Sequence, residues 1–399
     1  MNFELNFAQA ALKKDVRGFT EKKYRFGDRS ALLQEGLDAQ ESNWTAFAQR
    51  GWLGAAIPRN YGGLGGDASE TAVIAHEFGR ALVVEPYMGC AVMAPQTLLA
   101  VASASQLALV MPDVVAGKSK IALAYSEPQT RGMPEPIFLR AERVPDGYRI
   151  YGFKTLVLGG AVADRFIVSA VAVDQPVLLL VDAVSPGLNI HAVELHDGSH
   201  AAQLNFEGVF VPTEQLLAID NAALDGLRLG LAHGTIALCA ELVGVMERAI
   251  EITAEYIRTR VQFGRPIGQF QTLKHRIADM ATEMELARSM LFALMVAVDG
   301  EDKSTIQRLV SQAKSLVCRS AKNICGQAIQ MHGGIGMTEA YPIGHYFKRA
   351  VVADIILGSS DSHNGLRAQE LESTLKTAEL RWYELLPVWW SAQNEAFTG

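Results

Sequence analysis

Two segments about seventy residues apart carry the side chains and glycines with the clearest chemical potential in this chain. The first, residues 258–271, reads Arg-Thr-Arg-Val-Gln-Phe-Gly-Arg-Pro-Ile-Gly-Gln-Phe-Gln, and the second, residues 330–342, reads Gln-Met-His-Gly-Gly-Ile-Gly-Met-Thr-Glu-Ala-Tyr-Pro. Arginine offers paired donors to phosphate oxygens in a geometry that lysine cannot match. Glycine lets backbone amides come within hydrogen-bonding reach where a β-carbon would obstruct them. Both segments therefore contain donors suited to phosphate.

Composition limits the kind of protein that can carry these segments. The chain has 399 residues, of which 49% are hydrophobic and 20% charged, and this balance is typical of a globular protein with two or three domains. The formal charge of −7 gives no basic surface for nucleic acid. No stretch approaches the ~20 uninterrupted apolar residues of a membrane span, and residues 1–6, Met-Asn-Phe-Glu-Leu-Asn, lack the positively charged start and apolar run of a secretory signal. We therefore expect a cytoplasmic protein without nucleic-acid or membrane binding.

The cysteines and histidines give no sign of a metal or a disulfide framework. Cys90, Cys239, Cys318 and Cys325 lie far apart or in apolar helical sequence, and no Cys-x-x-Cys spacing occurs. No grouping of His, Asp and Glu has the spacing of metal ligands. We expect four buried free thiols and no metal site.

The pattern of apolar residues changes twice along the chain. It is helical from about residue 31 to 119, apart from the glycine cluster at 61–66. Strand-like segments follow at 121–125, 147–151, 165–170 and 177–181. Helical spacing then returns over 226–259, 271–299 and 302–332, with Gly300 able to end one helix and Asp302 or Ser304 able to cap the next. The order predicts an N-terminal helical domain (1–119), a middle β domain (120–222) and a C-terminal helical domain (223–399). No Gly-x-Gly-x-x-Gly follows a strand, which argues against a Rossmann domain.

This order and the two motif segments resemble the acyl-CoA dehydrogenase family over nearly the whole chain. The resemblance implies an N-terminal helical domain, a middle β-barrel and a C-terminal four-helix bundle. It also implies FAD as the cofactor. In that family the arginine of the first segment reaches across a dimer interface to the pyrophosphate of the neighbouring subunit's FAD, and the second segment approaches the ADP moiety. The matching positions here are Arg260, Gln262, Phe263, Phe270, Gln271, Gln330, Gly333 and Gly334.

The middle of the chain agrees with the family only in part. Ser126, in Tyr-Ser-Glu-Pro, matches the hydroxyl of the Thr-Glu-Pro motif that meets the flavin ring. The next residues, 129–133, read Gln-Thr-Arg-Gly-Met where the family has Gly-x-Gly-Ser-Asp. Leu156 and Leu158 stand where the family places a tryptophan and a threonine beside the flavin. A leucine cannot donate a hydrogen bond to a flavin nitrogen.

The catalytic base of the family has no counterpart at either of its two known positions. Leu357 occupies the usual position of the glutamate, and Gly234 occupies the alternative. Removing a proton α to a thioester requires a base within hydrogen-bond reach. Asp354, Asp361 and Glu241 are weak replacement candidates, because exposed or ion-paired carboxylates are the commoner interpretation. For Glu241, which lies in an apolar run, we expect a structural role with a charged partner.

Among family members, the chain looks most like the small subunits of bacterial heteromeric acyl-CoA dehydrogenases, of the pimeloyl-CoA or steroid side-chain type. This likeness implies an α2β2 assembly in which a homologous, base-containing partner desaturates an acyl-CoA at the α,β position. The present chain would then support FAD across the interface, with electron-transfer flavoprotein as acceptor. Two alternatives stay open. One is a self-sufficient flavoenzyme with a relocated base, or a flavin monooxygenase on the same fold; the other is a non-enzymatic acyl-CoA binder or scaffold.

Overall fold

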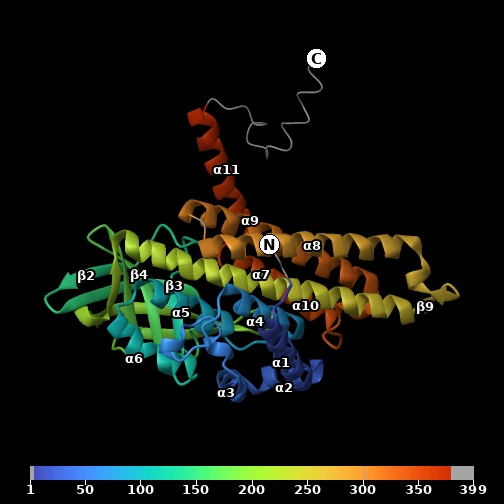
Figure 1. Cartoon of the computed structure of the whole chain (residues 1–399), viewed down its shortest axis with the longest axis horizontal. Coiled ribbons are helices and arrows are strands. Elements are labelled where there is room, and N and C mark those ends of the chain that lie inside the picture. The colour runs from blue at the N-terminus through green and yellow to red at the C-terminus, as the bar shows by residue number, and fades with distance from the viewer. Residues whose placement is uncertain (1–3, 301, 379–399) are drawn as a thin grey trace.

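The computed structural model describes residues 4–300 and 302–378, and its helices and strands follow the predicted order of helices, sheet and helices (Figure 1). The transitions fall between Val115 and Ile121 and at Asp220, close to the predicted domain boundaries, which stay predictions. The N-terminal helices are α1 (Phe7–Lys23), α2 (Phe26–Glu35), α3 (Glu41–Gln49), α4 (Ala68–Ala81), α5 (Ala94–Val101) and α6 (Ala104–Val115), with a π-helical segment η4 (Tyr87–Met93) before α5.

The middle segment forms one eight-stranded sheet rather than the expected barrel. Its order is β6-β7-β3-β2-β4-β5-β8, and β1 pairs with β4 in parallel. Because β6 and β8 end the order without pairing with each other, the sheet stays open, and the barrel prediction was wrong. Alternating burial identifies strands, but it carries no information on closure. The strands are β1 (Ile121–Ala124), β2 (Arg140–Val144), β3 (Gly147–Leu158), β4 (Arg165–Ala172), β5 (Gln175–Asp182), β6 (Leu188–Glu194), β7 (His200–Pro212) and β8 (Leu216–Ile219).

Three long helices dominate the C-terminal part: α7 (Asp220–Thr259), α8 (Gln271–Gly300) and α9 (Lys303–His332). These confirm the three predicted stretches. The Asp302 carboxylate accepts from the backbone amides of Ser304 and Thr305, so the predicted cap is also confirmed. The shorter α10 (Ile343–Ile355) packs against α7 and α9, and α11 (Ser360–Ala378) follows. A four-helix bundle stays a prediction. Between α7 and α8 the chain turns through β9 (Val261–Gln262) and β10 (Arg265–Pro266).

Helix α7 is the central element of the fold. By length and composition it is the one described helix that could cross a membrane, but 83% of its most apolar window is buried inside the protein. Two glycines bring its backbone against α4. A β-carbon at Gly79 would lie 1.9 Å from the Glu241 carbonyl oxygen, and one at Gly244 would lie 2.0 Å from the His76 carbonyl oxygen. Side chains at these positions would therefore separate the two helices.

Candidate functional site

The largest described cavity lies between α7, α9, α11 and the loop that follows β1. Its volume is about 660 Å³, within the range of small-molecule sites. Tyr125, Thr235 and Leu357 are among its walls. Two ion pairs also lie on its walls. Arg228 on α7 donates to Glu135 at 3.0 Å, and Lys303 at the start of α9 donates to Asp225 at 2.6 Å. The cavity therefore combines an apolar lining with two ion pairs.

Of the two expected base positions, Leu357 lines this cavity and Gly234 lies directly beside Leu357. Leu357 follows α10 and is buried. A β-carbon at Gly234 on α7 would lie 3.6 Å from the Leu357 Cδ1 atom and 2.6 Å from the Met93 Cγ atom. The two base positions that the family resemblance names are therefore close together in this fold. Neither position supplies a group that can accept a proton, and Met93 leaves no room for a longer side chain at 234.

None of the three replacement carboxylates lines the cavity. The Asp354 carboxylate accepts a hydrogen bond from Lys322 Nζ at 2.6 Å. It also accepts from the backbone N–H of Ser360 and so caps the first turn of α11. Burial would raise the pKa of Asp354, but the hydrogen bonds from Lys322 and Ser360 outweigh that effect and lower it. Asp361 is exposed at the start of α11. Both residues therefore have ordinary structural surroundings.

Glu241 has the charged partner that its apolar surroundings predicted. The Arg349 guanidinium on α10 donates to both Glu241 oxygens, at 2.5 and 2.8 Å, and to Asp197 at 2.9 Å. Burial would raise the pKa of Asp197, but the charge of Arg349 outweighs that effect and lowers it. Removing Arg349 would leave two buried carboxylates unpaired, a loss that typically costs about 3–5 kcal/mol. Glu241 is a structural residue.

Ser126 is the one predicted flavin contact at this end of the molecule. It is buried, and its Oγ atom has no hydrogen-bond partner. Beneath it, the fully buried Lys154 Nζ donates to the Glu127 carboxylate at 2.7 Å and to Ser169 Oγ at 2.9 Å. Burial lowers the pKa of Lys154 to about 8, although the Glu127 carboxylate acts against that change. The ion pair ties the loop after β1, which contains Ser126, to β3.

The two leucines on β3 supply only apolar contacts. Leu156 has a φ of 50°, a left-handed conformation that is uncommon for a residue with a β-carbon. Leu158 packs against η4, since a β-carbon at Gly89 would lie 2.4 Å from the Leu158 carbonyl oxygen. The end of β3 is thus in direct contact with the N-terminal helical part.

The two motif segments meet at the other end of α7, beyond the sheet, where Figure 1 shows β9. Tyr256 near the end of α7 stacks on His332 at the end of α9, with ring centroids 4.4 Å apart. Arg260 is the exposed residue that follows α7, and its side chain makes no hydrogen bond or ion pair within the described part of the chain. Gly333 and Gly334 are exposed, and β-carbons there would meet no atom within 4 Å.

The other predicted cofactor residues lie in the same region. Phe263 is 88% exposed, and its ring is 6.1 Å from that of Phe270. Arg265 lies over the Phe270 ring at 4.3 Å. The remaining exposed positions are Gln262, Gln271 and Gln330. The structure therefore brings together all the predicted residues except Ser126.

The length of α7 separates Ser126 and Leu357 from Arg260. Thr235 lines the cavity with Leu357, and Arg260 follows 25 residues later in the sequence. At a rise of about 1.5 Å per residue this is roughly 38 Å along the helix axis. One dinucleotide in the cavity of this chain therefore cannot reach Arg260 of the same chain.

Comparisons with known proteins agree with this architecture. Residues 7–118 match the family model described as acyl-CoA dehydrogenase, N-terminal domain, and residues 227–371 match the corresponding C-terminal domain. The mitochondrial 2-methylacyl-CoA dehydrogenase of Solanum tuberosum is 30% identical over 389 residues, covering 93% of this chain and 94% of the relative. The chain belongs to the acyl-CoA dehydrogenase family. Members of this family are oxidoreductases that act on acyl-CoA and depend on FAD.

Two solved structures resemble the fold closely. The ChsE4-ChsE5 complex from Mycobacterium tuberculosis is similar with a TM-score of 0.85 and 25% identity, covering 93% of this chain and 99% of that chain. A variant of the Tcur3481-Tcur3483 steroid acyl-CoA dehydrogenase gives a TM-score of 0.83 and 27% identity, covering 92% and 99%.

FAD, the cofactor of acyl-CoA dehydrogenases, fits the donors at the two ends of this chain. At one end, the buried Ser126 hydroxyl without a partner can donate to a flavin atom. At the other, the exposed Arg260 guanidinium can donate paired hydrogen bonds to phosphate oxygens. The Gly333 N–H is already bonded to the carbonyls of Ile329 and Gln330, and the Gly333–Gly334 turn contributes an exposed backbone without side chains that a phosphate can approach. Within residues 4–300 and 302–378, no group of three His, Cys, Asp or Glu side chains could hold a metal ion. The four cysteines are free and buried, as predicted.

Sequence reasoning missed the polar residues of the acyl-CoA dehydrogenase cavity. His363 Nε2 lies 2.8 Å from the Leu357 carbonyl oxygen, and its Nδ1 lies 3.1 Å from Ser311 Oγ. Because a carbonyl can only accept, Nε2 carries the proton and Nδ1 accepts from Ser311. The partners in this contact are 52 residues apart, and the Arg228–Glu135 pair spans 93. No local pattern signals such pairs.

Proposed function

We propose that this chain is the FAD-supporting subunit of a heteromeric acyl-CoA dehydrogenase whose homologous partner carries the catalytic base. The observation that carries the proposal is the division of the two half-sites along α7. At one end, Arg260 is exposed and its side chain makes no hydrogen bond or ion pair within the described residues, and the Gly333–Gly334 turn beside it is exposed; at the other end, Leu357 and Gly234 occupy the base positions. A second subunit can use the first half-site while supplying the base that this chain lacks.

Two relatives support a heteromeric assembly. Both structures described above carry two protein names, ChsE4-ChsE5 and Tcur3481-Tcur3483, and the second is a steroid acyl-CoA dehydrogenase. We extend this arrangement to the present chain as an α2β2 assembly. The substrate class we propose is an acyl-CoA, of the steroid side-chain or pimeloyl type, in the cytoplasm.

The residues of this chain have defined tasks in the proposed complex. Bound FAD supplies the oxidising power for α,β-desaturation, with electron-transfer flavoprotein as the acceptor. Arg260 donates paired hydrogen bonds to the pyrophosphate seated in the partner, and the Gly333–Gly334 turn approaches the ADP moiety. The exposed Phe263 ring and the half-buried Phe270 ring provide apolar contact area beside these donors. Leu357 keeps the wall of this chain's own cavity free of a proton acceptor.

The two alternatives make different demands on this cavity. A self-sufficient dehydrogenase needs an available base, but the carboxylates on the described walls, Glu135 and Asp225, are each paired with a cation. A flavin monooxygenase does not need that base, and tightly bound FAD in the isolated chain would favour it. A scaffold without flavin has no use for the unpartnered Arg260 guanidinium.

Co-expression with a base-containing homologue tests the proposed function. We expect the two chains to purify as one complex that reduces a dye with an acyl-CoA, because only the complex combines base and pyrophosphate donor. A general base contributes about 10²–10⁴-fold in rate. The partner with its glutamate changed to glutamine is the matched control and should lose the activity. Full activity of that control would show that the base comes from elsewhere and would contradict the proposal.

A further inference from the structure

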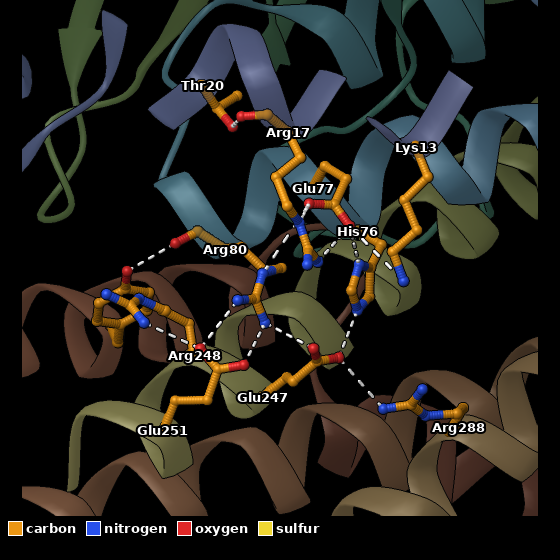
Figure 2. Close-up of polar contacts among 11 residues, drawn as sticks. Lys13, Arg17, Thr20, His76, Glu77, Arg80, Glu247, Arg248, Glu251 and Arg288 are labelled. Atoms are coloured by element: carbon orange, nitrogen blue, oxygen red, sulfur yellow. Dashed lines mark hydrogen bonds and ion pairs between the residues drawn. The ribbon is translucent and has the colours of Figure 1, made fainter. Parts of the chain in front are cut away.

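A cluster of charged side chains connects the helices α1, α4, α7 and α8, away from the site described above (Figure 2). Some of the hydrogen bonds in this cluster cross the contact between α4 and α7. Five lysine and arginine side chains meet four glutamates: Lys13, Arg17, Arg80, Arg248 and Arg288 against Glu77, Glu247, Glu251 and Glu285. His76 lies between Glu77 and Glu247, at 3.1 and 2.9 Å. The cluster therefore carries an excess of positive charge.

The central cations are tightly paired. Arg17 donates to both Glu77 oxygens at 2.8 and 2.9 Å, and Arg80 donates to Glu247 at 2.6 Å and to Glu251 at 2.9 Å. Burial would raise the pKa of Glu247, but the hydrogen bond from His76 and the charges of Arg80 and Arg288 hold it at about 2. These residues form a stable ionic core.

Lys13 and Arg288, in contrast, are loosely paired. Lys13 Nζ is 3.9 Å from Glu77, and Arg288 Nη2 is 3.3 Å from Glu247. The Nε atom of Arg288 is buried and has no hydrogen-bond partner. An unsatisfied buried donor typically costs about 1–3 kcal/mol, and more when it is charged. Both side chains can therefore gain from an additional acceptor.

These two cations and His76 line a second cavity of about 520 Å³, between α1, α4, α7 and α8. From Arg288 its wall continues along α8 through four apolar side chains: Leu291, Phe292, Met295 and Val296. Asp299 lies beyond them, about 16 Å from Arg288 along the helix axis, and Glu4, which precedes α1, also lines the cavity. Along α8 the wall thus runs from a cation through an apolar stretch the length of a medium alkyl chain to a carboxylate.

We propose that this cavity binds a medium-chain carboxylate, with its head group between Lys13 and Arg288 and its alkyl chain along α8. The carboxylate supplies acceptors for the Lys13 ammonium and the Arg288 guanidinium, whose side chains are 36% and 30% exposed and whose contacts with the glutamates are long. The alkyl chain buries Met295 and Val296 from water. The carboxylate of Asp299 disfavours the reversed orientation. This site is independent of the proposed FAD-supporting role.

Binding of decanoate to the full chain, measured by displacement of a dansylated fatty acid, tests the site. We expect decanoate to displace the probe and decanol to bind about ten- to a hundredfold more weakly, because decanol lacks the charge that Lys13 and Arg288 recognise. The double variant Lys13→Met/Arg288→Met should lose affinity by the same factor. Val296→Trp should remove binding while leaving both cations in place.

Two matched variants separate this cavity from other cation-lined surfaces. Arg248→Met removes a cation of the same cluster that does not line the cavity, and Lys303→Met removes one from the larger cavity. Both should bind decanoate like the unchanged chain, with unchanged circular dichroism spectra as evidence of folding. Equal affinity for decanoate and decanol, or weakening by Lys303→Met alone, would overturn the proposal.

Discussion

In the assembled complex, Arg260→Ala is expected to weaken FAD binding by roughly ten- to a hundredfold while leaving the subunits together. A charge-assisted hydrogen bond to phosphate contributes about 1.5–3 kcal/mol, which corresponds to that factor in the dissociation constant. The substitution should weaken FAD binding without destabilising the chain. The Arg260 side chain makes no hydrogen bond or ion pair within the described part of its own chain that the substitution would break. Titration of FAD into the apo complex measures the change.

A structural role for Arg260 predicts a different result. A cation at a helix C-terminus contributes only about 0.3–1 kcal/mol, and this contribution appears as stability of the chain. Arg258→Ala is the matched control, since Arg258 is also exposed and lies in the last turn of α7. If Arg260→Ala and Arg258→Ala lowered the melting temperature equally and left the FAD dissociation constant unchanged, Arg260 would not belong to the cofactor site.

Leu357→Glu is expected to give an inactive and destabilised chain rather than a restored dehydrogenase. Leu357 is 6% exposed and is in van der Waals distance of the Gly234 position, so an added carboxylate would have no partner there. An unpaired buried carboxylate has a raised pKa and costs several kcal/mol at neutral pH. Because the folded state then binds the proton more tightly than the unfolded state, the variant should lose stability as pH rises above about 4.5.

The isosteric Leu357→Gln variant separates charge from shape. Urea unfolding of both variants from pH 4 to pH 8 should show a pH-dependent loss of stability for the glutamate variant alone. Dye reduction with acyl-CoA by Leu357→Glu in the absence of a partner would show that the cavity retains a functional flavin site.

The sequence predicted the elements well because helical and strand periodicity are local properties. The spans of α8 and α9 and the Asp302 cap follow from residues within a few positions of one another. The barrel prediction failed because closure depends on whether β6 meets β8, and these strands are separated by the whole of β7. Local alternation is the same in an open sheet and in a closed one.

The residues of the candidate site could be predicted where they belong to one continuous segment of the sequence. Arg260, Gln330 and the glycine turn belong to two continuous motifs, and the fold places these motifs side by side. The charged partners were not predictable: Glu241 pairs with Arg349 across 108 residues, and Arg228 pairs with Glu135 across 93. Such pairs are set by how α7 packs against α10 and against the loop after β1, which no single segment encodes.

The FAD content of the purified chain, alone and in complex with its partner, tests the central claim most directly. Flavin absorbance should show little or no FAD on the isolated chain, because Leu156, Leu158 and Leu357 supply no hydrogen bonds to it and Arg260 lies at the far end of α7 from its own chain's cavity. The complex should hold FAD tightly and oxidise acyl-CoA. One tightly bound FAD per isolated chain, together with turnover of an acyl-CoA, would contradict a subunit that supports the flavin of its partner.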